Sequence, residues 1–124
     1  MLGSSELRAG FSSNESDSPM YTCENIVSRF RDRKRSANMV LCGTDCYADA
    51  QSRGNIKSPF DGNVVCGFDT MEYMLDNTFS KLGIDTDRVD HPLLLTEPLC
   101  NPEYSRGQMN ELLFEAYRVQ SVNY

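Results

Sequence analysis

The sequence predicts an α/β fold, and three segments carry this prediction. Residues 70–82 and 105–117 each repeat apolar side chains at the spacing of one helix face. Between them, Leu93-Leu94-Leu95 is a short, continuous apolar run, which is typical of a strand buried on both faces. A strand, a link rich in proline and an amphipathic helix together make a unit of an α/β layer.

Composition restricts the class of protein. The chain has 124 residues, 40% of them hydrophobic, and a mean hydropathy of −0.48. This is enough for one small domain with an apolar core. No apolar run approaches the roughly 20 residues of a membrane-spanning helix. The N-terminus also lacks the charged and apolar segments of a signal peptide. We therefore expect an intracellular protein without membrane contact.

Five cysteines and one histidine limit the chemistry. The cysteine number is odd and no Cys-x-x-Cys pair occurs, so neither a disulfide framework nor a zinc site is predicted. Reduced, partly buried thiols are the expectation. The single imidazole, His91, precedes Pro92 at a strand entrance, and we interpret it as structural, with no catalytic residue predicted.

The first 11 residues predict a turn followed by a strand. Gly3-Ser4-Ser5 is small and bears hydroxyl groups, and such a segment can present backbone N–H groups to an anion. An ordinary hairpin is the alternative. Residues 6–11 alternate polar and apolar side chains, as a strand does, and the serine-rich residues 12–19 predict a loop.

A basic cluster stands out in the next part of the chain. It contains Arg29, Arg31, Arg33, Lys34 and Arg35, whereas residues 66–124 hold ten acidic and four basic side chains and supply the net charge of −6. Such a cluster favours contact with nucleic acid, an acidic protein surface or an import receptor. The alternative is a solvated loop.

Short elements are expected around this cluster. Residues 25–28 and 38–42 predict strands, the second closed by Gly43. Residues 48–51 predict a helical turn that Gly54 ends. Ile56 and Val64-Val65 predict two more strands around a turn at residues 58–63, where Asp61-Gly62 is a strong turn signal.

Two helices follow. The first is predicted over residues 70–82, with Asp69 as N-cap, Glu72 reaching back to it and Gly83 after the end. The second is predicted to begin at Ser105, a good N-cap, with Gln108 completing a capping box. Its apolar face consists of Met109, Leu112, Leu113, Ala116 and Tyr117.

Several separated motifs resemble one family. Leu94-Leu95-Thr96-Glu97, Asn101-Pro102, Arg106 with Met109, and Phe114-Glu115 are similar, in residues and spacing, to the signature of the actin family. Arg8-Ala9-Gly10-Phe11 resembles the end of that family's first phosphate-binding hairpin. Two positions depart from conventional actin, Cys100 and Ser105, and Met1 stands where the family has a metal-associated aspartate.

The resemblance implies a fold and a nucleotide site. The implied fold is a partial actin-like ATPase fold of the ribonuclease H-like class, comprising part of the first lobe. About residues 1–23 and 67–124 would form subdomain 1, and about 24–66 subdomain 2. The residues that would line nucleotide phosphates are Gly3, Ser4, Ser5, Glu6 and Arg8. No metal ligand is carried over, because the aspartate is missing at Met1.

Within the family, the chain looks closer to one nuclear subfamily of actin-related proteins than to conventional actin. The residues that agree include 57–61, 74–76, 99–102, 104–106 and 111–115. Proteins of that subfamily are subunits of the Ino-eighty chromatin-remodelling complex. The resemblance implies a nuclear scaffold or nucleosome-contact subunit that supports transcription and DNA repair, with remodeller subunits and histone or DNA as partners.

The chain is much shorter than an actin fold. Full-length family members bind ATP, but hydrolysis requires several elements that position the phosphates together. We therefore expect no ATPase activity from this chain, and whether it binds ATP is left open. We expect a truncated chain or one that folds against a partner. Two alternatives remain: an actin-type ATP-binding protein of the cytoskeleton, and a small binding module that uses the basic cluster.

Overall fold

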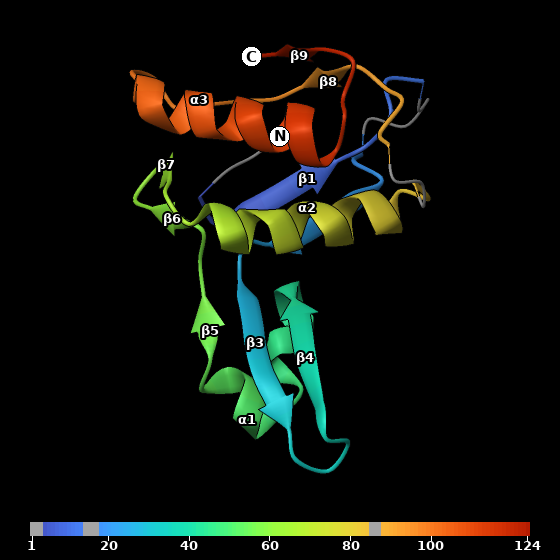
Figure 1. Cartoon of the computed structure of the whole chain (residues 1–124), viewed down its shortest axis with the longest axis vertical. Coiled ribbons are helices and arrows are strands. Elements are labelled where there is room, and N and C mark those ends of the chain that lie inside the picture. Colours follow the sequence, from blue (N-terminus) through green and yellow to red (C-terminus); the bar gives the residue numbers. More distant parts are fainter. Residues whose placement is uncertain (1–3, 14–17, 85–87) are drawn as a thin grey trace.

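A computed structural model describes residues 4–13, 18–84 and 88–124 of the chain. It is mixed α/β, as predicted (Figure 1). The strands are β1 (Glu6–Ala9), β2 (Tyr21–Glu24), β3 (Val27–Asp32), β4 (Ala37–Cys42), β5 (Ile56–Lys57), β6 (Phe60–Asp61), β7 (Val64–Val65), β8 (Leu93–Leu94) and β9 (Val122–Asn123). The helices are α1 (Ala50–Arg53), α2 (Phe68–Lys81), α3 (Glu103–Glu111), the 3₁₀ helix η1 (Gly43–Tyr47) and the π-helical turn η2 (Leu112–Ala116).

The elements form two groups in space. At one end of the molecule, β3 lies between β4 and β5 in an antiparallel sheet, and α1 lies against it (Figure 1). At the other end, the hairpin β1–β2, the helices α2 and α3 and the parallel pair β8–β9 lie together (Figure 1). The predicted division at residues 24 and 66 into two actin-like subdomains stays a prediction.

The core lies mainly between α2, α3 and the strands of the hairpin β1–β2. Its fully buried members include Met71 and Met74 of α2, Leu113 of η2 and Val27 of β3. The predicted apolar face of the second helix is confirmed at Met109 and Leu113. Burying such side chains is the main favourable contribution to folding.

Helix α2 begins two residues before the predicted start, and its cap is different. Its N-cap is Gly67, and no side chain caps it, so the predicted cap at Asp69 is wrong. Instead, the carbonyl oxygen of Pro59 accepts the N–H groups of Cys66 and Gly67, at 2.9 and 3.0 Å. This contact turns the chain so that the helix begins directly afterwards.

The predicted end of α2 is confirmed. Gly83 follows the C-cap Leu82 with a φ of +84°, a conformation that glycine adopts without strain. The N–H of Gly83 donates to Ser80 O and that of Ile84 to Phe79 O, which is the pattern of two hydrogen bonds that defines a Schellman motif. The end of the helix is therefore determined by local sequence.

Helix α3 also begins earlier than predicted. Its N-cap is Pro102, and the N–H of Arg106 donates to Pro102 O at 3.1 Å. Ser105 lies inside the first turn and is buried, so the predicted capping box with Gln108 is wrong. The hydroxyl of Ser105 donates instead to the carbonyl oxygen of Val65, at 2.9 Å, and so ties α3 to β7.

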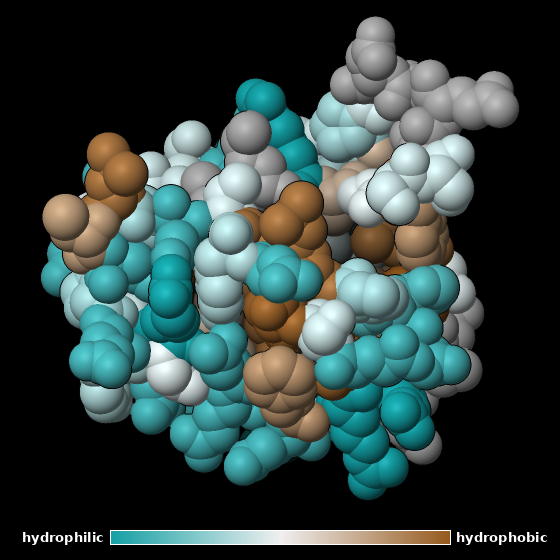
Figure 2. All heavy atoms as spheres, turned by 90° about the horizontal axis from the view of Figure 1, so that it is seen from above, coloured by the Kyte–Doolittle hydropathy of each residue, from teal (hydrophilic) through white to brown (hydrophobic). Residues whose placement is uncertain are grey.

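The strand predicted at residues 93–95 is shorter and more exposed than expected. Strand β8 has two residues and, among the residues that the structure describes, pairs with β9 alone. Leu94 is 77% exposed, so the prediction of burial on both faces is wrong. Figure 2 shows the molecule from the end that carries α3, β8 and β9. This face is largely hydrophilic, with a strip of hydrophobic side chains near its middle.

The short elements between residues 37 and 65 largely follow prediction. Strand β4 covers the predicted residues 38–42. Helix α1 begins two residues later than the predicted turn at 48–51, and Gly54 is its C-cap. The turn expected at residues 58–63 is narrower, because β6 and β7 pair through Phe60↔Val65 and Asp61↔Val64. That register leaves Gly62 and Asn63 as the turn. Part of the predicted loop 12–19, residues 14–17, lies outside the described residues.

Gly43, the first residue of η1, packs closely against Cys23 of β2. It has a φ of +66°, and a Cβ added there would lie 2.5 Å from the Sγ atom of Cys23. Real Cβ atoms essentially never approach another atom so closely. The glycine at this position is therefore required both by its backbone conformation and by the thiol beside it.

We predict that Gly43→Ala destabilises the chain by more than ~2 kcal/mol, because left-handed strain and a clash add. Gly62→Ala is the matched control, since Gly62 has a φ of +61° and nothing within 4 Å of an added Cβ. It should cost only about 1 kcal/mol. Urea unfolding measures both. The double variant Cys23→Ala/Gly43→Ala should recover part of the loss. Equal costs at the two glycines would contradict the steric argument.

Candidate functional site

The predicted phosphate-contact residues lie at the start of β1. Ser4 and Ser5 are exposed, and the carbonyl oxygen of Ser5 accepts the N–H of Asn25 at 3.0 Å. Gly3, like Met1, lies outside the described residues. Glu6 and Arg8 follow in β1 on one face of the strand, since their positions differ by two. The structure therefore brings four of the five predicted residues to one short segment.

Arg8 is paired with a carboxylate on its own strand. Its Nη2 and Nε atoms lie 2.9 and 3.2 Å from Oε2 of Glu6. Both side chains remain substantially exposed, so the pair contributes little to stability. It has a larger effect on anion binding, because Glu6 neutralises the cation and places a negative charge beside it. An incoming phosphate has to displace this carboxylate.

A wide, open groove of about 860 Å³ runs beside these residues. Its walls include Arg8 and Gly10 from the end of β1, and His91 and Leu94 around β8. The ring of His91 packs edge-on against Phe11, with 5.4 Å between ring centroids. This contact accounts for the position of the imidazole without a chemical role, in line with the structural interpretation.

The basic cluster lies on a hairpin and not on an irregular loop. Arg29 and Arg31 belong to β3, and Arg33, Lys34 and Arg35 form the turn that leads into β4. Arg29 and Arg31 therefore lie on a strand and not in a loop, and both are exposed. Contact of the cluster with a partner stays a prediction. In Figure 1 the hairpin turn lies at one end of the molecule and β1 lies in the other group of elements, so the cluster and the predicted phosphate-contact residues are apart.

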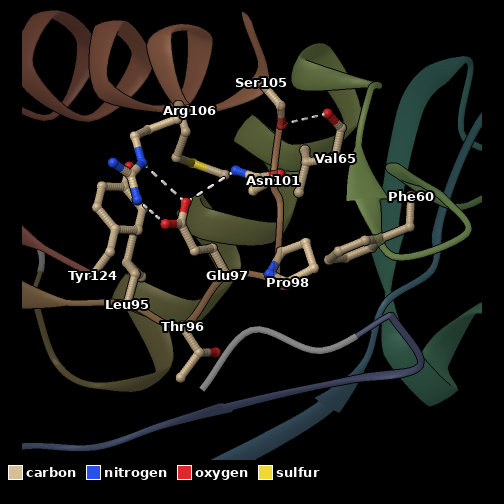
Figure 3. A pocket seen from close by; sticks show the side chains of 11 residues that line it. Phe60, Val65, Leu95, Thr96, Glu97, Pro98, Asn101, Ser105, Arg106 and Tyr124 are labelled. Carbon is tan, nitrogen blue, oxygen red and sulfur yellow. Dashed lines mark hydrogen bonds and ion pairs between the residues drawn. The ribbon is translucent and has the colours of Figure 1, made fainter. Parts of the chain in front are cut away.

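The prediction missed a polar network between the β8 segment and α3. The guanidinium of Arg106 forms two hydrogen bonds with the carboxylate of Glu97, one of them from Nε to Oε2 at 3.1 Å. Asn101 donates to the same carboxylate at 3.0 Å, and the guanidinium lies 4.8 Å from the ring centroid of Tyr124 (Figure 3). The sequence signal was present, because Glu97, Asn101 and Arg106 all belong to the family motif.

The volume of the adjoining pocket indicates whether this network binds a ligand or has a structural role. The pocket that these residues line has a volume of about 20 Å³ (Figure 3). That is room for about one water molecule, whereas pockets for small ligands are on the order of 300–1,000 Å³. A two-bond guanidinium–carboxylate pair fixes relative orientation as well as distance. The network therefore holds the 97–106 link in place.

Three thiols lie near one another where the two groups of elements meet. Cys23 and Cys46 are buried and Cys42 is half-buried, whereas Cys66 and Cys100 are exposed. Burial raises the pKa of the Cys42 thiol to about 12, and burial also raises the pKa of Cys46. A raised pKa keeps these thiols protonated and unreactive at neutral pH.

Within residues 4–13, 18–84 and 88–124, no cluster of three or more His, Cys, Asp or Glu side chains is placed to hold a metal ion.

Comparisons with known proteins give a consistent result. The family model described as "Actin" matches residues 2–124. The "Actin-like protein arp5" of Schizosaccharomyces pombe is 50% identical over 122 residues, 98% of this chain and 16% of that protein. "Actin-related protein 5" of Saccharomyces cerevisiae is 38% identical over 99% of this chain and 16% of that protein. "Actin-related protein 5" of Homo sapiens is 37% identical over 98% and 21%. The chain thus spans about a fifth or less of the length of these relatives.

We predict that Ser105→Ala lowers the free energy of unfolding by about 1–3 kcal/mol, because it leaves the buried carbonyl oxygen of Val65 without its donor. Ser80→Ala is the control. Ser80 is exposed on α2, and its replacement should change stability by less than about 0.5 kcal/mol. Thermal or urea unfolding of both variants is the measurement. Equal free energies of unfolding for the two variants would show that the hydrogen bond between Ser105 and Val65 makes no net contribution to stability.

We also predict that Glu6→Gln tightens the binding of ATP or tripolyphosphate by a factor of roughly two to five, the range expected for releasing an exposed ion pair. Calorimetric titration of the 124-residue chain measures the affinity. Glu111→Gln, an equal charge change on α3, should have no effect, and Arg8→Gln should weaken binding. If neither the Glu6 nor the Arg8 variant changes the affinity, this segment does not contact phosphate.

Proposed function

The chain belongs to the actin family, and from this premise we propose that it is part of a non-catalytic, nuclear actin-related subunit of an Ino-eighty type chromatin-remodelling complex. The predicted family, its actin-related protein 5 subfamily and the partial actin-like α/β fold are confirmed. The observation that carries the proposal is the identity of 37–50% over nearly the whole chain with proteins of that name.

The network around Glu97 supports a scaffold function. It occupies the motif on which the resemblance rests, yet its pocket has room for about one water molecule. Its residues hold a helix against a link, and no reacting group is placed among them. These motif residues therefore serve the shape of the lobe, which is what a subunit that acts through its surface requires.

The phosphate segment supports the non-catalytic part of the proposal. Phosphoryl transfer depends on cations aimed at the transferred group and on a positioned water. Arg8, the cation predicted for this purpose, is held by Glu6 at 2.9 Å. We expect ATP to be a ligand of full-length family members, and the purified chain to release no phosphate from ATP above the rate of a protein-free blank. Protein-dependent turnover would overturn this expectation.

Association is the direct test of the proposed function. A tagged form of the chain, expressed in cells of a related organism, should recover the subunits of a chromatin remodeller after nuclease treatment, which removes bridging DNA. Leu113→Ala is the control, because it empties a fully buried core position and should abolish recovery together with the fold. Recovery of cytoskeletal proteins without any remodeller subunit would contradict the proposal.

Among the residues that the structure describes, no helix is long and apolar enough to span a membrane. Nuclear residence and contact with nucleosomes follow from the proposed complex. The same purification tests them, since the recovered proteins would be nuclear and would include histones after the nuclease treatment.

A further inference from the structure

The hairpin β3–β4 concentrates positive charge at one end of an acidic molecule. Five of the seven residues from Arg29 to Arg35 are basic and only Asp32 is acidic, whereas the whole chain has a net charge of −6. The hairpin turn points away from α2, α3 and β8–β9 (Figure 1). The basic turn is therefore kept apart from the acidic helices.

The turn is ordered by its own contacts. Oδ1 of Asp32 accepts the backbone N–H of Lys34 at 2.9 Å, and Oδ2 lies 3.7 Å from Nε of Arg35. The antiparallel ladder is continuous from Val27↔Cys42 to Asp32↔Ala37. A turn that is already ordered loses little conformational freedom when it binds a partner.

The cations differ in availability. The guanidinium of Arg29 lies 4.9 Å from the ring centroid of Tyr73, so this side chain is held against α2. The backbone of Arg31 is held in the β3–β4 ladder, and its carbonyl oxygen accepts a hydrogen bond from Nε2 of Gln51 at 2.7 Å. Within the described part of the chain, the side chains of Arg31, Arg33 and Lys34 make no hydrogen bond or ion pair, and all three are exposed. Arg35 adds a fourth exposed cation, paired with Asp32 at its edge.

The remaining side chains of the turn indicate the kind of partner. Residues 31–38 include no aromatic and no large aliphatic side chain. Protein interfaces are usually built around such side chains, and single-stranded nucleic acids are bound by stacking on aromatic rings. Phosphate groups of a duplex require only cations, and arginine binds them with a two-pronged geometry.

We propose that the turn formed by Arg31, Arg33, Lys34 and Arg35 binds the phosphate backbone of duplex DNA without reading its bases. Charge complementarity carries this assignment, because four exposed cations on one ordered turn match a regular row of phosphates. The inference rests on the proposed function and deepens it, since it names the surface of this chain and the part of a nucleosome that the contact would use.

The test uses the purified 124-residue chain and a fluorescent 20-base-pair duplex of arbitrary sequence, with anisotropy measured between low and moderate salt. The triple variant Arg31→Gln/Arg33→Gln/Arg35→Gln should weaken binding at least tenfold. It should also reduce the slope of log affinity against log salt by about 0.9 for each phosphate group that the variant no longer neutralises. A duplex of different sequence should bind equally well.

A second triple variant has the same net charge as the hairpin variant and serves as its control. Lys81→Gln/Arg88→Gln/Arg118→Asn removes three cations elsewhere, with asparagine at position 118 because Arg118 has a φ of +53°. It should change affinity less than twofold. Equal loss in both variants would reduce the effect to overall charge and overturn the proposal. The proposal would also be overturned if the hairpin variant kept its affinity for DNA but lost its binding to a polyglutamate peptide.

Thermal unfolding of each variant checks that the fold is retained. Recovery of remodeller subunits by the hairpin variant distinguishes this test from the test of the proposed function.

Discussion

The two long helices depend on the backbone of one small hairpin. The carbonyl oxygen of Pro59, just before β6, accepts two N–H groups at the start of α2, and the carbonyl oxygen of Val65 in β7 accepts the hydroxyl of Ser105 in α3. A segment of a few residues thus determines where both helices begin and how they face each other. The Glu97–Arg106 pair then fixes the link that enters α3. The Glu97–Arg106 pair of the family motif and the Ser105–Val65 hydrogen bond thus together position the start of α3.

The sequence predicted what local patterns control. Burial at helical spacing was correct at Met109 and Leu113, whereas Ala116, on the same predicted face, is exposed in η2. Gly83 was correct because the Schellman motif needs only neighbouring residues. Both N-caps were wrong for one reason. The carbonyl groups of Pro59 and Val65 belong to the neighbouring β6–β7 hairpin, Val65 lies 40 positions from Ser105, and capping propensity cannot anticipate contacts with another element. Leu94 was expected to be buried because an apolar run reports a preference for burial and cannot supply the neighbouring strands.

The candidate sites were predicted to a similar extent. The positions of Arg8 and of the basic cluster followed from the sequence, but their surroundings did not. Alternation of Arg29 and Arg31 with Phe30 and Asp32 is a strand pattern, which the high charge of the segment obscured. The pairing of Arg8 with Glu6 is an i, i+2 contact along one strand face, which follows from the alternation itself. The Glu97–Arg106 contact spans nine positions with no periodicity, so spacing alone could not predict it.

The five cysteines differ in exposure, so their rates of alkylation report on the conformation of the chain. Two cysteines, Cys66 and Cys100, are exposed, while Cys23 and Cys46 are buried and Cys42 is half-buried where the two groups of elements meet. A neutral alkylating reagent should therefore label two sites rapidly and reach the other three only when that junction opens. Mass spectrometry would count the labels without any engineered reporter. Opening of the junction could thus be followed separately from global unfolding, at a rate set by the packing of Gly43 against Cys23.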